Sequence, residues 1–138
     1  MAWKRPSTDT PFHIDWEWWA QNDRNYRLFL HEQLCEECRR RFPSPLTLAE
    51  VDWIDPVTAE VTRADPLQMC LRSECAHSPN FIHEALPVAA AVFRVFLMVG
   101  NRALTPADLH EHLPWRTPEM ILQVVGGRQV HYGIRPAA

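Results

Sequence analysis

The densest apolar stretch of the chain runs from residue 85 to residue 100, ALPVAAAVFRVFLMVG. It is apolar at nearly every position, with Arg94 near its middle, and its 16 residues are too few to cross a bilayer. A helix that is apolar on all sides is typical of the interior of a domain. Pro87 suits its start and Gly100 suits its end. The pattern therefore predicts a central helix over 88–99. The residues expected to be most buried are the large apolar ones, Phe93, Phe96 and Leu97.

A repeated start signal predicts two short helices after this core helix. The signal is a capping threonine followed by proline and an acidic residue, and it occurs as TPAD at residues 105–108 and as TPE at 117–119. The second of these helices is expected over 120–125, because two glycines follow it. Residues 129–134 then alternate between polar and apolar positions, which predicts a strand.

The N-terminal part of the chain predicts an arm followed by a long helical segment. Residues 1–14 are polar with two prolines, and we expect them to form an irregular arm. Asp15 can cap a helix that opens with WEWW and is interrupted or restarted at residues 22–23. From there the helical pattern runs to about Arg41, before two prolines that cannot continue a helix. The tryptophans expected to cover the core from this segment are Trp16 and Trp19.

Two short strands and a further helix are predicted in the middle of the chain. Residues 51–54 and 60–63 have the composition of strands, and the sequence between them, DPVTA, is a common turn. We expect a small hairpin with Trp53 on its inner face. A helix is expected over 65–74, with Asp65 as its N-cap and a proline at its first position. The residues on the inner face of this helix are Leu67, Cys70 and Leu71.

Four cysteines provide the main chemical signal of the sequence. Cys35 and Cys38 have the C-x₂-C spacing of a half-site for a tetrahedral metal, and a looser pair follows at Cys70 and Cys75. A spacing of five residues places the second pair on different sides of a regular helix, so Cys75 is expected beyond the helix end. We predict one structural zinc ion that clasps helix, hairpin and helix. Its predicted ligands are Cys35, Cys38, Cys70 and Cys75.

The cysteines leave further interpretations open. Cys70 lies in an apolar context and could be a core residue, with His77 or His31 as the fourth ligand in its place. The thiols could also hold no metal, or Cys35 and Cys38 could form a redox pair. Redox pairs of the thioredoxin type open a helix, whereas this pair is expected to close one. A catalytic metal is not expected, because four thiols leave no position open for water, and no motif indicates an enzyme.

Composition and charge are those of an ordinary globular protein. The 138 residues suffice for one domain or two small ones, with 46% hydrophobic and 22% charged residues. A net charge of −3 gives no general attraction to nucleic acid or anionic membranes. The sequence begins MAWKRPSTDT, without the apolar run of a signal peptide, so we expect a cytoplasmic protein. In a reducing compartment four cysteines favour metal binding over disulfides.

The C-terminal half resembles a winged helix-turn-helix domain over residues 86–136. The residues that carry the resemblance are LTPADL at 104–109 for the second helix, 116–125 for the third and 128–136 for the wing. The resemblance implies that the third helix enters the major groove of duplex DNA and that the wing touches the backbone or the minor groove. The nucleic-acid-binding candidates that it implies are Arg116, Thr117, Glu119, Gln123, Arg128, Gln129, His131 and Arg135.

A second function remains open for this half. The third helix is short and has no Arg or Lys after Arg116, so few cations are available for phosphates. Winged-helix domains also serve protein contacts, and an exposed aromatic patch would then bind a second copy of the chain or another protein. The tryptophans expected in such a patch are Trp16, Trp18 and Trp115.

The sequence as a whole predicts a mainly α fold with small β elements. A zinc-stapled helix–hairpin–helix module over 1–83 is expected to pack on a winged-helix-like half over 84–138. The favoured function is a zinc-binding regulator that binds duplex DNA. The alternative is a structural-zinc module for protein–protein interaction without DNA binding. No membrane contact and no small-molecule substrate are indicated.

Overall fold

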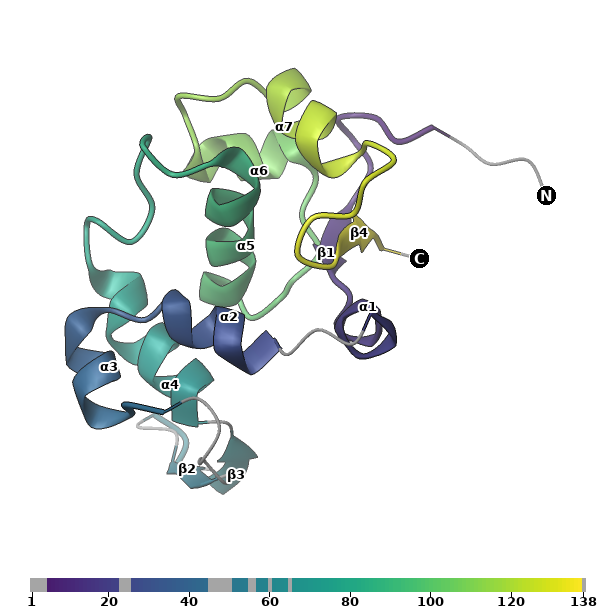
Figure 1. Cartoon of the computed structure of the whole chain (residues 1–138). Coiled ribbons are helices and arrows are strands. Elements are labelled where there is room, and N and C mark those ends of the chain that lie inside the picture. The colour runs from purple at the N-terminus through teal and green to yellow at the C-terminus, as the bar shows by residue number, and fades with distance from the viewer. Residues whose placement is uncertain are drawn as a thin grey trace. The chain divides into compact units, whose positions relative to one another are not determined.

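The described part of the chain is mainly helical in the computed structural model (Figure 1). The structure describes residues 5–22, 26–44, 51–54, 57–59, 61–64 and 66–137. Within these ranges it contains seven α-helices, one 3₁₀ helix and two antiparallel pairs of strands. A mainly α fold with small β elements is therefore confirmed.

The chain divides into two compact units. One unit comprises residues 1–24 and 82–138, and the other comprises residues 25–81. The N-terminal segment thus belongs with the C-terminal half of the chain, whereas the predicted boundary after residue 83 grouped it with the cysteines.

Three helices follow one another in the first unit: α5 (Val88–Met98), α6 (Pro106–His112) and α7 (Pro118–Val125). Helix α5 contacts both of the others, and its Phe93 and Phe96 are fully buried. Leu97 is 6% exposed, so the predicted core of this helix is confirmed. Helix α5 spans 11 residues, and across the described ranges no helix is both long and apolar enough to cross a membrane.

Both predicted threonine caps form. The hydroxyl of Thr105 accepts a hydrogen bond from the backbone N–H of Asp108 at 3.0 Å, and the Asp108 carboxylate accepts one from the N–H of Thr105 at 3.0 Å. The hydroxyl of Thr117 accepts from the N–H of Met120 at 3.1 Å. The start signals in the sequence therefore fix where α6 and α7 begin.

A short sheet joins the two ends of the first unit. Strand β1 (Phe12–Ile14) pairs antiparallel with β4 (Ile134–Pro136), and Phe12 also forms a bridge with Leu104. The expectation of an irregular arm over 1–14 is wrong for residues 12–14, where Phe12 and Ile14 are buried on either side of a half-buried histidine. This alternation covers only three residues, which is too short to stand out in the sequence.

The predicted strand over 129–134 is also wrong in its bounds. Residues 128–133 form bends and a turn, and the strand begins at Ile134. The cause is the backbone at Tyr132 and Gly133, whose φ angles of 54° and 76° interrupt an extended chain. Strand β4 pairs with β1, so the described residues after α7 do not form the hairpin of a wing.

The tryptophan-rich helix α1 (Trp16–Gln21) buries one of the two tryptophans expected in the core. Asp15 caps it as predicted, accepting a hydrogen bond from the N–H of Glu17 at 3.0 Å. Trp19 is buried and its indole N–H donates to the carbonyl of Tyr132 at 3.0 Å. Trp16 is 37% exposed, so the expectation that it also covers the core is wrong: α1 buries Trp19 and leaves Trp16 at the surface.

The second unit contains the cysteines. Its elements are α2 (Tyr26–Glu32), α3 (Glu36–Arg41), β2 (Val51–Ile54), β3 (Val61–Ala64), α4 (Pro66–Ser73) and the 3₁₀ helix η1 (Cys75–His77). Strands β2 and β3 are antiparallel, with Val51 opposite Ala64, so the predicted hairpin is confirmed. The expected orientation of Trp53 and the expected cap at Asp65 lie outside what the structure describes.

Candidate metal centre

The helical pattern predicted to run from residues 22–23 to about Arg41 is interrupted between α2, which ends at Glu32, and α3, which begins at Glu36. Cys35 has an extended backbone, with φ −71° and ψ 167°, and is the N-cap of α3. Its N–H donates to the sulfur of Cys75 at 3.0 Å instead of to a helical carbonyl. The C-x₂-C pair therefore opens α3, and the expectation that it closes a helix is wrong. Because the N–H of Cys35 donates to this sulfur, it is not bonded to a helical carbonyl. The sequence pattern does not indicate that contact.

The second cysteine pair lies on two different elements. Cys70 is on the buried face of α4 with Leu67 and Leu71, as predicted. Helix α4 ends at Ser73, and Cys75 begins η1 and is buried. The expectation that Cys75 lies beyond the helix end is therefore confirmed. This break is what allows two cysteines five residues apart to approach one cluster.

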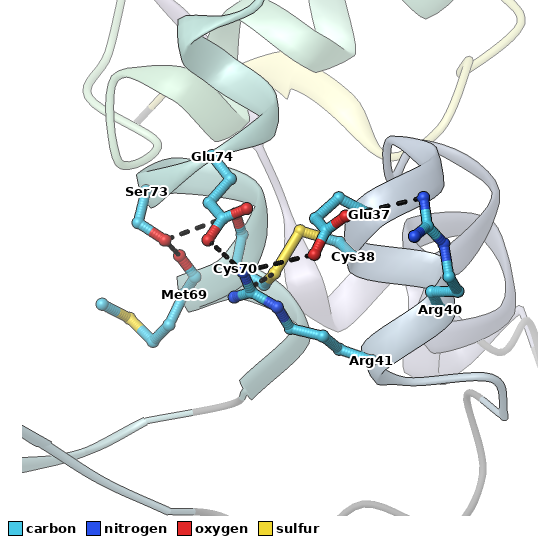
Figure 2. A network of polar contacts seen from close by, with 8 residues as sticks. All are labelled: Glu37, Cys38, Arg40, Arg41, Met69, Cys70, Ser73 and Glu74. Carbon is cyan, nitrogen blue, oxygen red and sulfur yellow. Dashed lines mark hydrogen bonds and ion pairs between the residues drawn. A yellow bond between two sulfur atoms is a disulfide. The ribbon is translucent and has the colours of Figure 1, made fainter.

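The four cysteines form a continuous set of sulfur contacts. The sulfurs of Cys35, Cys38 and Cys75 all lie within 4.8 Å of one another. Cys38 is joined to Cys70 by a disulfide across α3 and α4, with 6.1 Å between their Cα atoms (Figure 2). Cys35 and Cys75 are free thiols. Cys38 is thus shared by the three-sulfur cluster and by the disulfide.

Burial controls the ionisation of Cys75. Loss of solvent raises the pKa of its thiol to about 11, although the N–H of Cys35 acts in the opposite direction. The side chain of Cys35 raises this pKa further, through a hydrogen bond and through its charge. Without a cation in the cluster, Cys75 is therefore protonated near neutral pH. A bound divalent metal would supply the positive charge that a thiolate at this position lacks.

Cys35, Cys38 and Cys75 lie close enough to one another to hold a metal ion. Zinc–sulfur bonds of about 2.3 Å place tetrahedral sulfurs about 3.8 Å apart. Three of the four sulfurs lie within 4.8 Å of one another. Cys38 is also bonded to Cys70. A site with four thiolates would therefore require this disulfide to be reduced.

Histidines do not complete this cluster. The ring Nε2 of His31 lies 2.8 Å from the carbonyl oxygen of Phe42, which is a hydrogen bond that closes the end of α3. His77 is exposed on η1. Among the described residues, every group able to hold a metal consists of cysteines alone or of cysteines with Glu74. Cys70 is therefore the fourth sulfur in reach.

Two charged residues beside the sulfurs were not singled out in the sequence. The carboxylate of Glu74 lies within 4.8 Å of the sulfurs of Cys38 and Cys70. Arg41 forms an ion pair with Glu74 at 2.7 Å, as Figure 2 shows. Helical spacing could have indicated both, because Arg41 is three residues after Cys38 and Glu74 is four residues after Cys70.

The residues proposed to contact DNA are only partly brought together. The exposed ones are Thr117 at the N-cap of α7, Glu119 and Gln123 on the helix, Arg128 and Gln129 after it, and Arg135. Arg116 is half-buried, its Nε has no hydrogen-bond partner in the described part of the chain, and its carbonyl pairs with the ring of His110 at 2.6 Å. His131 is half-buried. Arg135 forms an ion pair with Asp15 at 3.2 Å.

Comparisons with known proteins add no assignment. A scan against protein-family models and searches of curated proteins and of solved structures found no match. The functional interpretation therefore rests on the geometry of the cysteine cluster and on the surfaces of the first unit.

Proposed function

We propose that residues 25–81 form a structural zinc module. Four cysteine thiolates would hold one ion and tie α3, α4 and η1 together. The observation that carries this proposal is that three sulfurs lie within 4.8 Å of one another while the fourth is bonded to one of them. A four-thiolate shell has no open position, so the ion stabilises the unit and takes no part in a reaction.

The proposal requires Cys38 and Cys70 to be reduced. We therefore place the zinc-loaded form in a reducing compartment such as the cytoplasm. The disulfide form is then the metal-free state of the same chain under oxidising conditions. Protein purified without reductant should yield a linked pair of peptides that contain these two cysteines.

Elemental analysis of protein purified in reductant, without added metal, tests the proposal. We expect about one zinc ion per chain. Cys38→Ser should abolish zinc binding and lower Tm by more than about 10 °C, because a structural site contributes on the order of 10 kcal/mol to folding. His77→Asn is the matched control and should retain the ion. A metal-free protein in reductant, with Tm unchanged by Cys38→Ser, would end the proposal.

For the biochemical role we propose a module for protein–protein interaction. Its support is the surface of the first unit, where Trp16 is 37% exposed and Met120 on α7 is 40% exposed. Of the tryptophans expected in an exposed patch, Trp18 and Trp115 are half-buried. Such apolar side chains are more useful against a protein than against phosphates. Light scattering on the zinc-loaded chain tests whether this partner is a second copy; a strict monomer would restrict the proposal to a different protein.

A DNA-binding regulator is the second candidate, and one observation favours it. Thr117 at the N-cap of α7 and Glu119 and Gln123 on the helix are exposed, and the exposed Arg128 follows it. These are the positions that a recognition helix would use. A gel shift with duplex DNA at low and moderate salt tests this candidate.

A further inference from the structure

Arg41 lies at the edge of the sulfur cluster and contacts three groups (Figure 2). Its guanidinium is 2.7 Å from a carboxylate oxygen of Glu74 and 3.6 Å from one of Glu37. It also approaches the sulfur of Cys70 at 4.0 Å. Arg41 is the last residue of α3, and Glu74 follows the end of α4, so this ion pair links the same two helices as Cys38 and Cys70.

Glu74 is a rival ligand for a metal in this cluster. Its carboxylate, with the sulfurs of Cys38 and Cys70, forms a second group whose ligand atoms all lie within 4.8 Å. Carboxylate oxygens are ordinary zinc ligands. The cluster therefore offers five groups, four sulfurs and one carboxylate, for the four positions of a tetrahedral ion.

The positive charge of Arg41 would partly neutralise the negative charge of a metal-loaded cluster. A zinc ion with four thiolates carries two surplus negative charges, and the carboxylates of Glu37 and Glu74 add to them. Among the contacts that the structure describes, Arg41 joins both carboxylates and a cysteine sulfur. Outer residues that donate to ligands orient them and tune the affinity of the metal.

We propose that Arg41 is a positioning residue that keeps the metal site all-sulfur. It holds the Glu74 carboxylate in an ion pair and places an N–H donor beside Cys70, so that the thiolate rather than the carboxylate occupies the fourth position. This inference rests on the proposed zinc site. It adds a selectivity, because an all-thiolate site favours zinc over harder cations that bind oxygen.

Cobalt(II) in place of zinc reports the number of sulfur ligands, because each thiolate contributes to the charge-transfer absorption. In Arg41→Gln we expect the absorption per bound cobalt to fall by about one quarter, as one of four thiolates is replaced by Glu74. Zinc affinity, measured by competition with a chromogenic chelator, should fall about 10- to 100-fold. The double variant Arg41→Gln/Glu74→Gln removes the rival carboxylate and should restore the wild-type absorption.

Arg40→Gln is the matched control. Arg40 also pairs with Glu37, at 3.6 Å, but its side chain is 75% exposed. We expect the cobalt spectrum and zinc affinity of this variant to stay within about twofold of wild type. Circular dichroism checks that each variant is folded. If Arg41→Gln fails to fold, Glu74→Gln still tests the all-sulfur site, because the proposal expects the wild-type absorption there and a changed absorption would overturn it.

The possible failures can be told apart. If the wild-type chain takes up neither zinc nor cobalt in reductant, the structural zinc module itself is wrong. If the wild type binds metal and Arg41→Gln keeps the same absorption and affinity, the role of Arg41 is wrong and the zinc module stands. A wild-type spectrum that already lacks one thiolate, and changes in Glu74→Gln, would make Glu74 a native ligand and overturn the inference.

Discussion

Gly133 fixes the path by which the chain enters β4. Its φ of 76° lies in the left-handed region, and an added Cβ would come within 2.7 Å of the indole nitrogen of Trp19 and 3.0 Å of the carbonyl oxygen of Asp15. The first contact is shorter than real Cβ contacts, and the second is tighter than most of them. The indole nitrogen involved is the one that donates to Tyr132. A side chain at residue 133 would therefore have two effects: it would strain the backbone, and it would push Trp19 away from its hydrogen bond with the carbonyl of Tyr132.

Gly133→Ala should lower the free energy of unfolding by about 1–3 kcal/mol, because it combines the cost of a left-handed alanine with the displacement of Trp19. Urea denaturation followed by tryptophan fluorescence measures it. Gly127→Ala is the control: its added Cβ would meet only the carbonyl oxygen of Gln123, at 3.4 Å, and its φ is not in the left-handed region. We expect that variant to stay within about 0.5 kcal/mol of wild type. Equal losses in both variants would contradict the prediction.

The cysteine cluster shows which site residues a sequence can supply. Spacing identified Cys35 and Cys38 as a pair and placed Cys75 beyond a helix end, because both follow from helical geometry. The pairing of Cys38 with Cys70 depends on how α3 and α4 pack against each other. The two cysteines are 32 residues apart, and this separation does not predict the packing. Arg41 and Glu74 were missed because charged residues near a helix end are usually solvated.

At the scale of elements, a side chain takes the place of a strand beside β1. The amide of Asn101 accepts a hydrogen bond from the N–H of Ile14 at 2.8 Å and donates to its carbonyl at 2.9 Å. Ile14 is 1% exposed, so its backbone groups have little access to water. Asn101 itself has a φ of 60°, which asparagine tolerates better than most residues. The turn after α5 thus completes the edge of the small sheet.

Asn101→Gly should lower the free energy of unfolding by about 1–3 kcal/mol. Glycine tolerates the left-handed backbone, so the loss reports the two buried groups of Ile14 left without partners. Asn22→Ala is the control, because its amide makes one hydrogen bond, to the carbonyl of Trp18, at an exposed position. Thermal denaturation of the two variants should differ clearly. If Asn101→Gly is as stable as wild type, water must satisfy Ile14 and the sheet edge is open.

Elements with local signals were predictable, and those defined by distant partners were not. The caps at Thr105 and Thr117 lie within three residues of the groups that they bind, so sequence alone placed α6 and α7. At the start of α3, the N–H of Cys35 is bonded to a sulfur 40 residues away. Strand β1 depends on partners near residue 135, more than 120 residues along the chain. A one-dimensional pattern carries no information about such pairings.

At the scale of the whole molecule, the same limit governs how the chain divides. Residues 1–24 join residues 82–138, so the first unit is discontinuous in sequence. Its 8 basic and 8 acidic residues make it formally neutral, while residues 25–81 carry 6 basic and 9 acidic ones. A boundary drawn from the sequence falls at a single point, after residue 83. It cannot show that residues 1–24 belong with residues 82–138.

This distribution of charge bears on the choice between DNA and a protein partner. Each phosphate that a protein neutralises steepens the salt dependence of log K by about 0.9. Among the described residues of the first unit, Arg128 is the exposed arginine next to α7, and Arg5 and Arg102 are exposed elsewhere. Arg116 is half-buried and Arg135 is paired with Asp15. Three such contacts would give a slope of about −3, against about −10 for a strong DNA-binding repressor. Glu119 on α7 would in addition repel phosphates.

We therefore expect the zinc-loaded chain to give no gel shift with fragmented genomic DNA at about 150 mM salt, and at most a weak one at low salt. Light scattering on the same sample should identify any stable oligomer. Arg128→Ala and Arg135→Ala form a matched pair, because the first cation is exposed and the second is bound to Asp15. A shift that survives moderate salt and weakens in Arg128→Ala and Gln123→Ala, but not in Arg135→Ala, would identify α7 as a DNA-reading helix. That result would favour the DNA-binding regulator over the interaction module. Exposed apolar side chains such as Met120 cannot explain a gel shift that depends on salt and on Arg128.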